Sequence, residues 1–405
     1  MATAALDEGA VRDAGIPDAV TLVERARAMI PALKSRARQC TADRNVPAQS
    51  IAEMRDAGFF RILQPKRYGG YEMHPQTFFD VQKALAEGCM STGWMYGVLG
   101  CHPFELALFP YRAQQEVWGD NPDTLVSSTY QPVGKVTHVE GGFRLSGHWG
   151  FSTGSTHCDW VLLGAFCPPD GDQPAEMRTF LLPRSDYTID ENAWHVFGLQ
   201  GTGSHDIIVD DVFVPEYRTH RSADGFLCTN PGQEVNSAPM YRLPWAQVFV
   251  RSVSTAAFGG AQAAINAGMA IMQDRVSSNT GKASKQDPML HAALAAAITQ
   301  RAEMEAALKA TFEELMGYAE RGEDIPMAKR AAFTYQSATV VRRLADLVDD
   351  MVQLLGGRAI YMTSDIIQPW LDLNAGRAHV ANDPNNRTQD LVGTLLGEPP
   401  ANPFL

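Results

Sequence analysis

The side chains best placed for chemistry follow a short extended segment that begins at two glycines. Gly141 and Gly142 allow a tight reversal of the chain, and the segment then reaches Ser152, Thr153 and Gly154. Two hydroxyl groups beside a bare backbone could hydrogen-bond to the polar edge of a flat ring. The same residues also fit an ordinary amphipathic hairpin, so the neighbouring sequence has to decide between the two interpretations.

The composition is that of a globular protein with an acidic surface. Of the 405 residues, 45% are hydrophobic and 20% are charged, and the formal net charge is −12. This charge disfavours binding to nucleic acid or to an anionic membrane. The sequence has no recognisable signal peptide and no apolar run of membrane-spanning length. We therefore expect a cytoplasmic protein.

The cysteine and histidine patterns disfavour disulfide and metal chemistry. The six cysteines are scattered without a C-x-x-C pair, and the histidines are dispersed without ligand spacing, so we expect free thiols and no metal site. No G-x-G-x-x-G motif follows a predicted strand and opens a helix, so no nicotinamide-binding domain is expected.

The chain divides into three regions by its local patterns. Residues 1–125 are predicted to be helical, residues 126–235 form short β-rich runs separated by turns, and residues 236–405 form long helices. The predicted strands are Val136–Val139, Phe143–Phe151, Trp160–Phe166, Thr179–Leu182 and Asp206–Val214. The four predicted C-terminal helices are Pro244–Val276, Pro288–Arg321, Pro326–Leu355 and Ser364–Ala381. The predicted fold class is α+β, with a β-sandwich or barrel between a helical domain and a four-helix bundle.

This order of regions, together with several marker segments, resembles the acyl-CoA dehydrogenase superfamily. The similarity covers nearly the whole chain, from roughly Ala26 to the C-terminus. The segments that carry it are Gly58–Pro65 with Tyr68–Gly70, Ser91–Trp94, Gly141–Gly154, Gly201–Asp206 and Val212–Pro215. The set resembles, in particular, the two-component, reduced-flavin-dependent aromatic monooxygenases of this superfamily.

The C-terminal region favours the monooxygenases over the dehydrogenases. A dehydrogenase of this superfamily needs a carboxylate base that removes the α-proton, but the comparable stretch, Leu371–Asp383, lacks that glutamate and contains His379. Asp372 has the character of a structural or capping carboxylate. The resemblance therefore implies an oxygenase component that hydroxylates a phenol ortho to its hydroxyl group through a C4a-hydroperoxyflavin.

The resemblance assigns catalytic roles to three residues. His102 would deprotonate or polarise the phenol, with a hydrogen bond from Ser128, and His379 would lie near the flavin peroxide. From the residues alone, each also has a structural interpretation. A lone histidine is often a satisfied, half-buried side chain, and Ser128 could merely cap the end of a strand.

The same resemblance implies a set of flavin contacts. Ser152 or Thr153 would hydrogen-bond to the flavin N5, and Ser127 would also contact the cofactor. The expected walls of the ring site are Trp94, Trp149 and Phe151. Arg275 would reach a flavin phosphate, including that of a neighbouring subunit; its other interpretation is a solvent-facing helix end.

The implied partners are reduced flavin (FMNH2 or FADH2), O2, a separate NAD(P)H:flavin reductase and a small aromatic substrate, in a homotetramer. Relatives that bind p-hydroxyphenylacetate carry an arginine where this chain has Ala246, and Pro244-Trp245 is more similar to the secosteroid hydroxylases. We therefore expect an apolar, polycyclic phenol in preference to a small aromatic acid.

Three alternatives remain at this point. One is a related flavin oxygenase that acts on sulfur or nitrogen. The second is an acyl-CoA dehydrogenase with a displaced base. The third is a non-enzymatic binding module that kept the fold.

Overall fold

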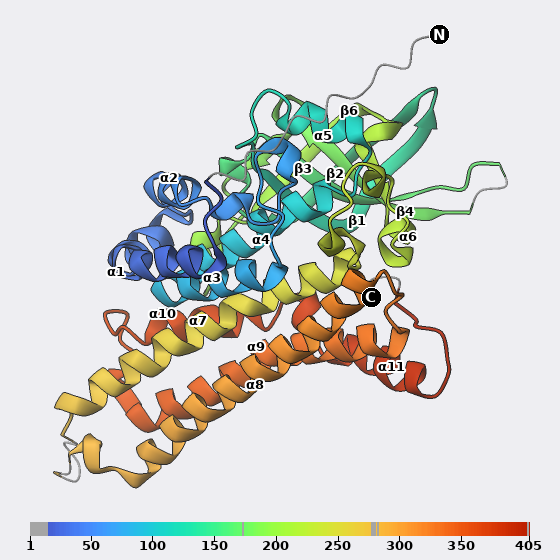
Figure 1. The fold of residues 1–405 in the computed structure, drawn as a ribbon. Coiled ribbons are helices and arrows are strands. Elements are labelled where there is room, and N and C mark those ends of the chain that lie inside the picture. Colours follow the sequence, from blue (N-terminus) through green and yellow to red (C-terminus); the bar gives the residue numbers. More distant parts are fainter. Residues whose placement is uncertain (1–14, 172–173, 277–280, 282, 403–404) are drawn as a thin grey trace.

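The structure is a computed structural model that describes residues 15–171, 174–276, 281, 283–402 and 405. A helical layer, a twisted β-sheet and a long helical bundle follow one another along the chain (Figure 1). The predicted α+β order is therefore confirmed.

The N-terminal region forms a helical layer. Its α-helices are α1 (Ala19–Asp43), α2 (Ala48–Asp56), α3 (Pro75–Gly88), α4 (Met90–Leu106) and α5 (Tyr111–Trp118). The side chain of Asp18 caps α1 by accepting a hydrogen bond from the backbone N–H of Thr21 at 2.7 Å. Every residue of α4 is buried. Gly93 lets α4 approach α3 closely, because a Cβ there would lie 2.4 Å from the Cβ of Ala86.

The middle region forms one seven-stranded sheet in the described part of the chain. Its strands are β1 (Val126–Val139), β2 (Gly142–Ser152), β3 (Trp160–Cys167), β4 (Glu176–Pro183), β5 (Thr188–Asp190), β6 (His205–Pro215) and β7 (Thr219–Arg221). The strand order is β5-β6-β2-β1-β3-β4-β7. The start of β1 pairs in parallel with β3, and its end pairs antiparallel with β2, with a register shift between Thr129 and Gly134.

Trp149 belongs to the core of the sheet. Its side chain is fully buried, and its indole N–H donates to the carbonyls of Gln131 at 3.1 Å and Gly164 at 2.9 Å. The prediction that Trp149 forms a wall of the ring site is therefore wrong. An alternating strand sends neighbouring side chains to opposite faces, and the sequence did not reveal which face Trp149 occupies.

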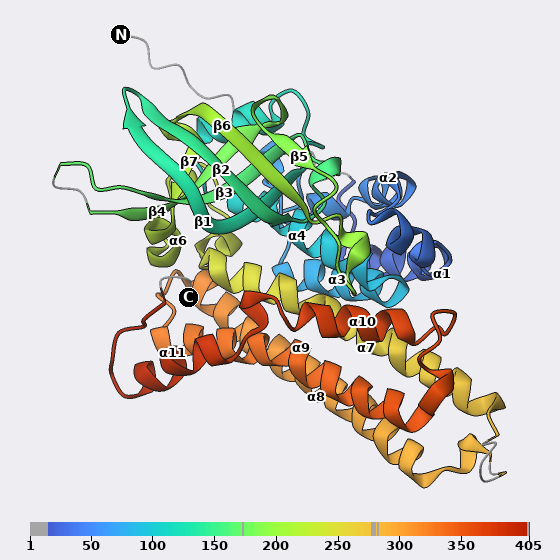
Figure 2. The ribbon, with the colours of Figure 1, turned by 180° about the vertical axis from the view of Figure 1, so that it is seen from behind.

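The C-terminal region is a bundle of long helices on the far side of α3 and α4 from the sheet (Figure 2). After the short helix α6 (Ser222–Leu227), its helices are α7 (Trp245–Asp274), α8 (Pro288–Arg321), α9 (Met327–Leu355), α10 (Ile367–Gly376) and α11 (Asn385–Leu395). The fourth predicted helix is shorter than expected, since Val380–Asn382 forms a separate 3-10 turn. The helix α11 was not predicted.

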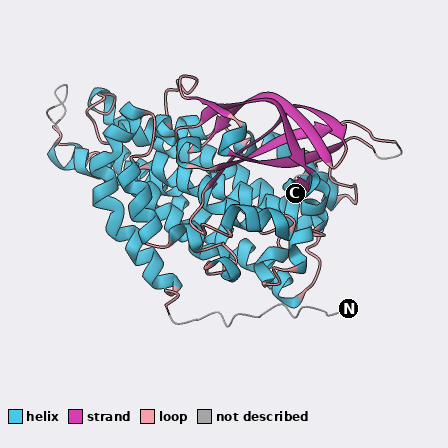
Figure 3. Ribbon diagram, turned by 90° about the horizontal axis from the view of Figure 1, so that it is seen from above, coloured by secondary structure: helices cyan, strands magenta, loops and turns pink. Residues whose placement is uncertain are grey.

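The helices α3 and α4 lie between the sheet and the bundle (Figure 2). They pack against α7, and α4 also contacts β1. The strands gather on one side of the molecule, against the helices (Figure 3). One hydrophobic core runs through the N-terminal helices and the bundle, while the sheet has a core of its own. We propose domain limits at about residues 125 and 235. No described helix is long and apolar enough to span a membrane.

Candidate active site

His102 projects from α4 into a fully buried environment. Its Nδ1 lies 2.5 Å from the carbonyl oxygen of Val126. Since a carbonyl can only accept, Nδ1 carries the proton and Nε2 presents a lone pair. Burial lowers the pKa of His102 to about 4, so the ring is neutral at pH 7. Nε2 has no hydrogen-bond partner in the described part of the chain, which leaves a buried acceptor available to a ligand.

The start of β1 presents two serines to opposite sides. Ser128 and Tyr130 share one face of the strand, and the Ser128 hydroxyl hydrogen-bonds to the Tyr130 phenol. The Tyr130 ring lies 6.5 Å from the ring of His102. Ser127 points the other way, toward Ser152, with 3.3 Å between the two hydroxyl oxygens. The structure thus brings Ser128 to the His102 side and Ser127 to the predicted flavin contacts.

Glu105 and Tyr130, which the sequence did not single out, lie in the same cluster as His102 and Ser128. Glu105 lies one helical turn after His102, and it accepts a hydrogen bond from the Tyr130 hydroxyl. Burial raises the pKa of Glu105 to about 8. Trp245 and Phe249 of α7 pack against the Tyr130 ring, at centroid distances of 6.4 and 5.2 Å. The sequence held a signal for both residues. Glu105 lies three residues after His102, on the same helix face, and Tyr130 lies two residues after Ser128, on the same strand face. We call His102, Glu105, Ser128, Tyr130 and Trp245 the buried polar cluster.

The predicted hydroxyl segment lies against the same helix. A Cβ at Gly154 would lie 3.0 Å from side-chain atoms of Met95 and Leu99, so this turn rests on α4 between Trp94 and His102. Thr153 hydrogen-bonds to Ser204 at 2.8 Å.

Trp94 and His379 meet at the other end of α4. Their rings pack edge to face at a centroid distance of 5.7 Å, although they come from opposite ends of the sequence. His379 is partly exposed, and its Nδ1 accepts a hydrogen bond from the backbone N–H of Ala381. Desolvation lowers its pKa to about 4. Trp94 and His102 are eight residues apart on α4, roughly 12 Å along the helix axis. Because His379 packs on Trp94 and the Ser152 turn rests on α4 between Trp94 and His102, the two histidines lie on either side of this turn.

Phe151 has an unusual backbone and an unusual exposure. Its φ is +67°, a value that is strained for a residue with a bulky side chain. The ring is 60% exposed and touches Trp194 edge to face at 5.7 Å. A strained backbone that holds an apolar ring in the open, next to Ser152, is typical of a ligand-contacting position.

Arg275 is not brought near the other predicted site residues. It follows the last residue of α7, at the tip of the bundle away from the sheet (Figure 1). Its guanidinium donates to the carbonyl of Leu354 at 3.3 Å. Any contact between Arg275 and a flavin phosphate therefore requires a second subunit, and this role stays a prediction.

Asp372 has a structural position. It is buried, and its Oδ1 accepts hydrogen bonds from the backbone N–H of Leu199 and the side chain of Gln368, both at 2.7 Å. Burial raises the pKa of Asp372 to about 6. The carboxylate thus ties α10 to the loop before β6, as a capping group does.

Two arginines near the start of α7 turn away from the buried polar cluster. Arg251 is buried with its guanidinium over the rings of Phe79 and Phe258, at 5.3 and 5.4 Å. Arg242 donates to the carbonyl of Ala319. Neither is placed to bind a carboxylate beside His102.

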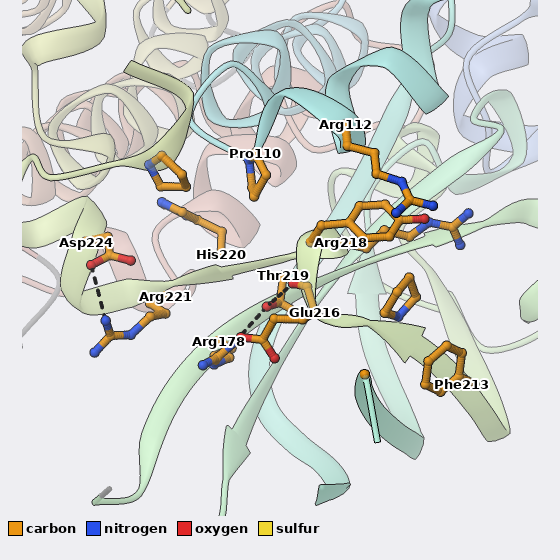
Figure 4. Close-up of a pocket in the computed structure, with 14 residues that line it drawn as sticks. Pro110, Arg112, Arg178, Phe213, Glu216, Arg218, Thr219, His220, Arg221 and Asp224 are labelled. Atoms are coloured by element: carbon orange, nitrogen blue, oxygen red, sulfur yellow. Dashed lines mark hydrogen bonds and ion pairs between the residues drawn. The ribbon is translucent and has the colours of Figure 1, made fainter. Parts of the chain in front are cut away.

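A separate surface cavity of about 840 Å3 lies between α5 and residues of β4, β6 and β7 (Figure 4). Its charged residues are paired with one another, as in Arg178 with Glu216 and Arg221 with Asp224. None of the predicted site residues lines it. The candidate active site is the buried polar cluster, where three buried polar atoms, His102 Nε2, Glu105 Oε1 and the Trp245 indole nitrogen, have no hydrogen-bond partner in the described part of the chain. In the described residues, no group of three or more His, Cys, Asp or Glu side chains could hold a metal ion.

The residues around the Ser152 turn fit a flavin. Phe151 and Trp94 offer apolar ring surfaces, and Ser127 and Ser152 offer hydroxyls. The hydroxyl of Ser155, on the same turn, is buried without a hydrogen-bond partner in the described part of the chain. An aromatic surface beside hydroxyl groups, one of them unsatisfied, matches a ring system with a polar edge.

Comparison with known proteins decides the family. The family described as "Acyl-CoA dehydrogenase, N-terminal domain" matches residues 18–118, and "Acyl-CoA dehydrogenase, C-terminal domain" matches residues 252–384. The flavin-dependent monooxygenase, oxygenase subunit HsaA, of Rhodococcus jostii RHA1 is 34% identical over 380 residues, which cover 92% of this chain and 97% of that protein. The chain belongs to the flavin-dependent monooxygenases of the acyl-CoA dehydrogenase superfamily.

Further members of this monooxygenase group agree. The crystal structure of the HsaA monooxygenase from M. tuberculosis has a TM-score of 0.90 and 32% identity, and the match covers 96% of this chain and 100% of that one. The FADH(2)-dependent resorcinol hydroxylase, oxygenase component, of Rhizobium sp. MTP-10005 is 31% identical over 392 residues, which cover 94% of this chain and 93% of that protein. The predicted enzyme class is thereby confirmed: the chain is the oxygenase component of a two-component monooxygenase that uses reduced flavin and O2.

Proposed function

We propose that this monooxygenase hydroxylates an apolar phenol at the carbon ortho to the phenol hydroxyl. When bound, reduced flavin would supply, together with O2, the oxygen atom that is transferred to an electron-rich ring carbon. The names of two relatives support a phenolic substrate: the resorcinol hydroxylase component and the p-hydroxyphenylacetate 3-hydroxylase component of Acinetobacter baumannii. The observation that carries the proposal is the buried, unpaired Nε2 of His102.

His102 orients and polarises the phenol. Its neutral Nε2 accepts the hydrogen bond of the phenol O–H, which increases electron density on the ring. The Val126 carbonyl fixes the tautomer and the direction of this lone pair. Ser128 supports the same position through its hydrogen bond with Tyr130. As the ring is oxidised, the hydroxyl proton can move to Nε2.

The residues around the Ser152 turn would hold the flavin and exclude water. Ser152 or Thr153 would hydrogen-bond to the flavin N5, with Ser127 nearby, and Trp94 and Phe151 would pack against the ring system. His379 contacts Trp94 and is neutral at pH 7; because its Nδ1 accepts from the backbone N–H of Ala381, its Nε2 carries the proton and can donate a hydrogen bond near the reacting oxygen. Water exclusion matters because it protects the oxygen donor from decay to H2O2.

The lining of the pocket supports an apolar, polycyclic phenol. Tyr130, Trp245 and Phe249 form an aromatic wall. The nearby guanidinium groups of Arg242 and Arg251 are held elsewhere, so a substrate carboxylate would lack a cationic partner. A small aromatic acid is therefore disfavoured.

Two partners belong to this proposal. A separate NAD(P)H:flavin reductase would supply the reduced flavin. A homotetramer would bring Arg275 of one subunit to the flavin phosphate of another. Exposed apolar residues at the bundle tip, Ile360, Tyr361 and Met362, are suited to such a contact between subunits.

The test supplies photoreduced FMNH2 or FADH2 to the protein without oxygen and then mixes it rapidly with O2 and a panel of phenols. We expect an oxygen adduct of the flavin that persists longer than without protein, and ortho-hydroxylated product. Oxidation of a thioether or amine panel without phenol hydroxylation would instead establish the sulfur- or nitrogen-oxygenating alternative. Flavin reoxidation at the protein-free rate, without any oxygenated product, would contradict the proposal.

A further inference from the structure

Glu105 is a buried carboxyl group with one oxygen in use and one oxygen free. The residue has no exposed surface, and the Tyr130 hydroxyl donates to its Oε2. Oε1 has no hydrogen-bond partner in the described part of the chain. A buried polar atom left unpaired costs about 1–3 kcal/mol, so a partner that arrives with the substrate would remove this cost.

The proton of Glu105 belongs on the free oxygen. Burial raises the pKa of Glu105 to about 8, so the carboxyl group is mostly neutral at pH 7. Oε2 accepts the Tyr130 hydrogen bond and therefore acts as the carbonyl oxygen, which leaves the O–H on Oε1. A neutral carboxylic acid in an apolar site is a strong hydrogen-bond donor toward a ligand oxygen.

Glu105 and His102 present a hydrogen-bond donor and a hydrogen-bond acceptor on one face of α4. Residues three apart on a helix are neighbours, with about 5–6 Å between their Cβ atoms. His102 Nε2 is an unpaired acceptor, and Glu105 Oε1 is an unpaired donor. The indole N–H of Trp245, in the same cluster, is a second unpaired donor. An aromatic ring with two oxygen substituents offers a hydrogen-bond partner to both His102 Nε2 and Glu105 Oε1.

We infer that Glu105, held by Tyr130, is a specificity-determining residue that donates a hydrogen bond to a second oxygen of the substrate, so that the preferred substrates are phenols with a further hydroxyl or carbonyl oxygen. This inference rests on the proposed function, because it places the reacting hydroxyl at His102. Glu105 takes no part in the oxygen transfer, so its loss affects substrate binding more than the rate of the bound complex.

The first test compares phenol with resorcinol, which adds one oxygen. Equilibrium binding of each compound to the flavin-free protein is measured by calorimetry, and KM and kcat are measured with reduced flavin. The wild type is expected to bind resorcinol at least about tenfold more tightly, the worth of one buried hydrogen bond to a neutral donor. Glu105→Leu should abolish this preference, so that phenol and resorcinol bind the variant about equally, whereas Glu105→Gln, which keeps an N–H donor, should retain most of it. An unchanged preference in Glu105→Leu would overturn the inference.

The second test holds even if Glu105→Leu fails to fold. The resorcinol preference of the wild type should fall as pH rises through about 8, because Glu105 then loses its proton, and Glu105→Gln should not show this fall. The titratable groups that interact with Glu105 are Cys101 on α4 and Tyr130 on β1, and His102 lies one helical turn before it on α4. Burial lowers the pKa of His102 to about 4 and raises those of Cys101 and Tyr130, so these groups keep their charge between pH 7 and 9. The same pH dependence in Glu105→Gln would also overturn the inference.

Failure of the proposed function has a different signature. If the wild type binds resorcinol preferentially but hydroxylates no phenol, the result supports recognition by Glu105 and contradicts the proposed phenol hydroxylation. If it hydroxylates phenols without any preference for a second oxygen, the proposed function stands and the role of Glu105 falls.

Discussion

Replacement of His102 by asparagine separates its two nitrogens. The asparagine amide can still donate to the Val126 carbonyl, as Nδ1 does, but it does not extend to the position of Nε2. The variant should therefore fold and keep the flavin contacts, while the phenol loses its hydrogen-bond acceptor. Loss of such a group typically lowers a rate by at least about a hundredfold.

The lowered pKa of His102 also decides how the phenol is activated. An ordinary phenol has a pKa of about 10, and the pKa of His102 is about 4. Full proton transfer before oxidation would cost about 8 kcal/mol, at 1.36 kcal/mol per pKa unit. A hydrogen bond to Nε2 is thus favoured over a separate phenolate, and the proton moves only as the ring is oxidised. Bound phenol should show the ultraviolet spectrum of the neutral form.

The assay is a single turnover of prereduced flavin on the protein, mixed with O2 and phenol, with product per flavin measured between pH 5 and 8. Wild-type product formation should be flat from pH 6 to 8, because protonation of His102 begins only as pH falls toward 4. His102→Asn should yield mostly H2O2, at an unchanged rate of flavin oxidation. An acid limb near pH 6.5, a phenolate spectrum, or full product yield from His102→Asn would each refute this reasoning.

Three further predictions concern the surroundings of the site. Asp372→Asn keeps the acceptor for Leu199 and stays neutral at every pH. Burial raises the folded-state pKa of Asp372 from 3.8 to about 6, so the ionised aspartate destabilises the folded protein by about 3 kcal/mol once pH exceeds 6. Calorimetry should therefore show the Tm of the variant roughly 3 °C above that of the wild type at pH 8 but not at pH 4. A Tm gain that is independent of pH would count against this. Ser152→Ala should raise H2O2 release per flavin roughly fivefold through loss of about 1 kcal/mol, and Ser152→Thr should restore coupling; an unchanged H2O2 yield would place the N5 contact elsewhere. Phe151→Gly should relieve strain of about 1 kcal/mol and stabilise the protein while it weakens reduced-flavin binding by calorimetry; tighter or equal flavin binding would remove Phe151 from the flavin site.

The order of regions and the hydroxyl segment could be predicted from the sequence because they depend on local patterns. Turn residues and alternating apolar positions indicate the strands of the sheet, and long alanine-rich stretches indicate the bundle. The site residues His102, Ser128, Ser152 and Trp94 came from the resemblance, and the structure places them along one helix and the strand ends beside it.

The remaining features depend on contacts between distant parts of the chain. Glu105 became a candidate only when Tyr130 of β1 was found to donate to it, and the sequence gives no sign of this pairing beyond helical and strand spacing. Trp149 was assigned to the wrong face because a bulge or register shift changes which side chains point inward. The contact between Trp94 and His379 joins residues that lie 285 positions apart in the chain.

The most direct test of the central claim is the fate of oxygen in a single turnover. The protein is loaded with reduced flavin and resorcinol, mixed with isotopically labelled O2, and the products are analysed by mass spectrometry. Our account predicts a ring hydroxylated ortho to an existing hydroxyl, with one labelled oxygen atom per molecule of product. Unmodified resorcinol, with all of the label in H2O2 and water, would contradict it.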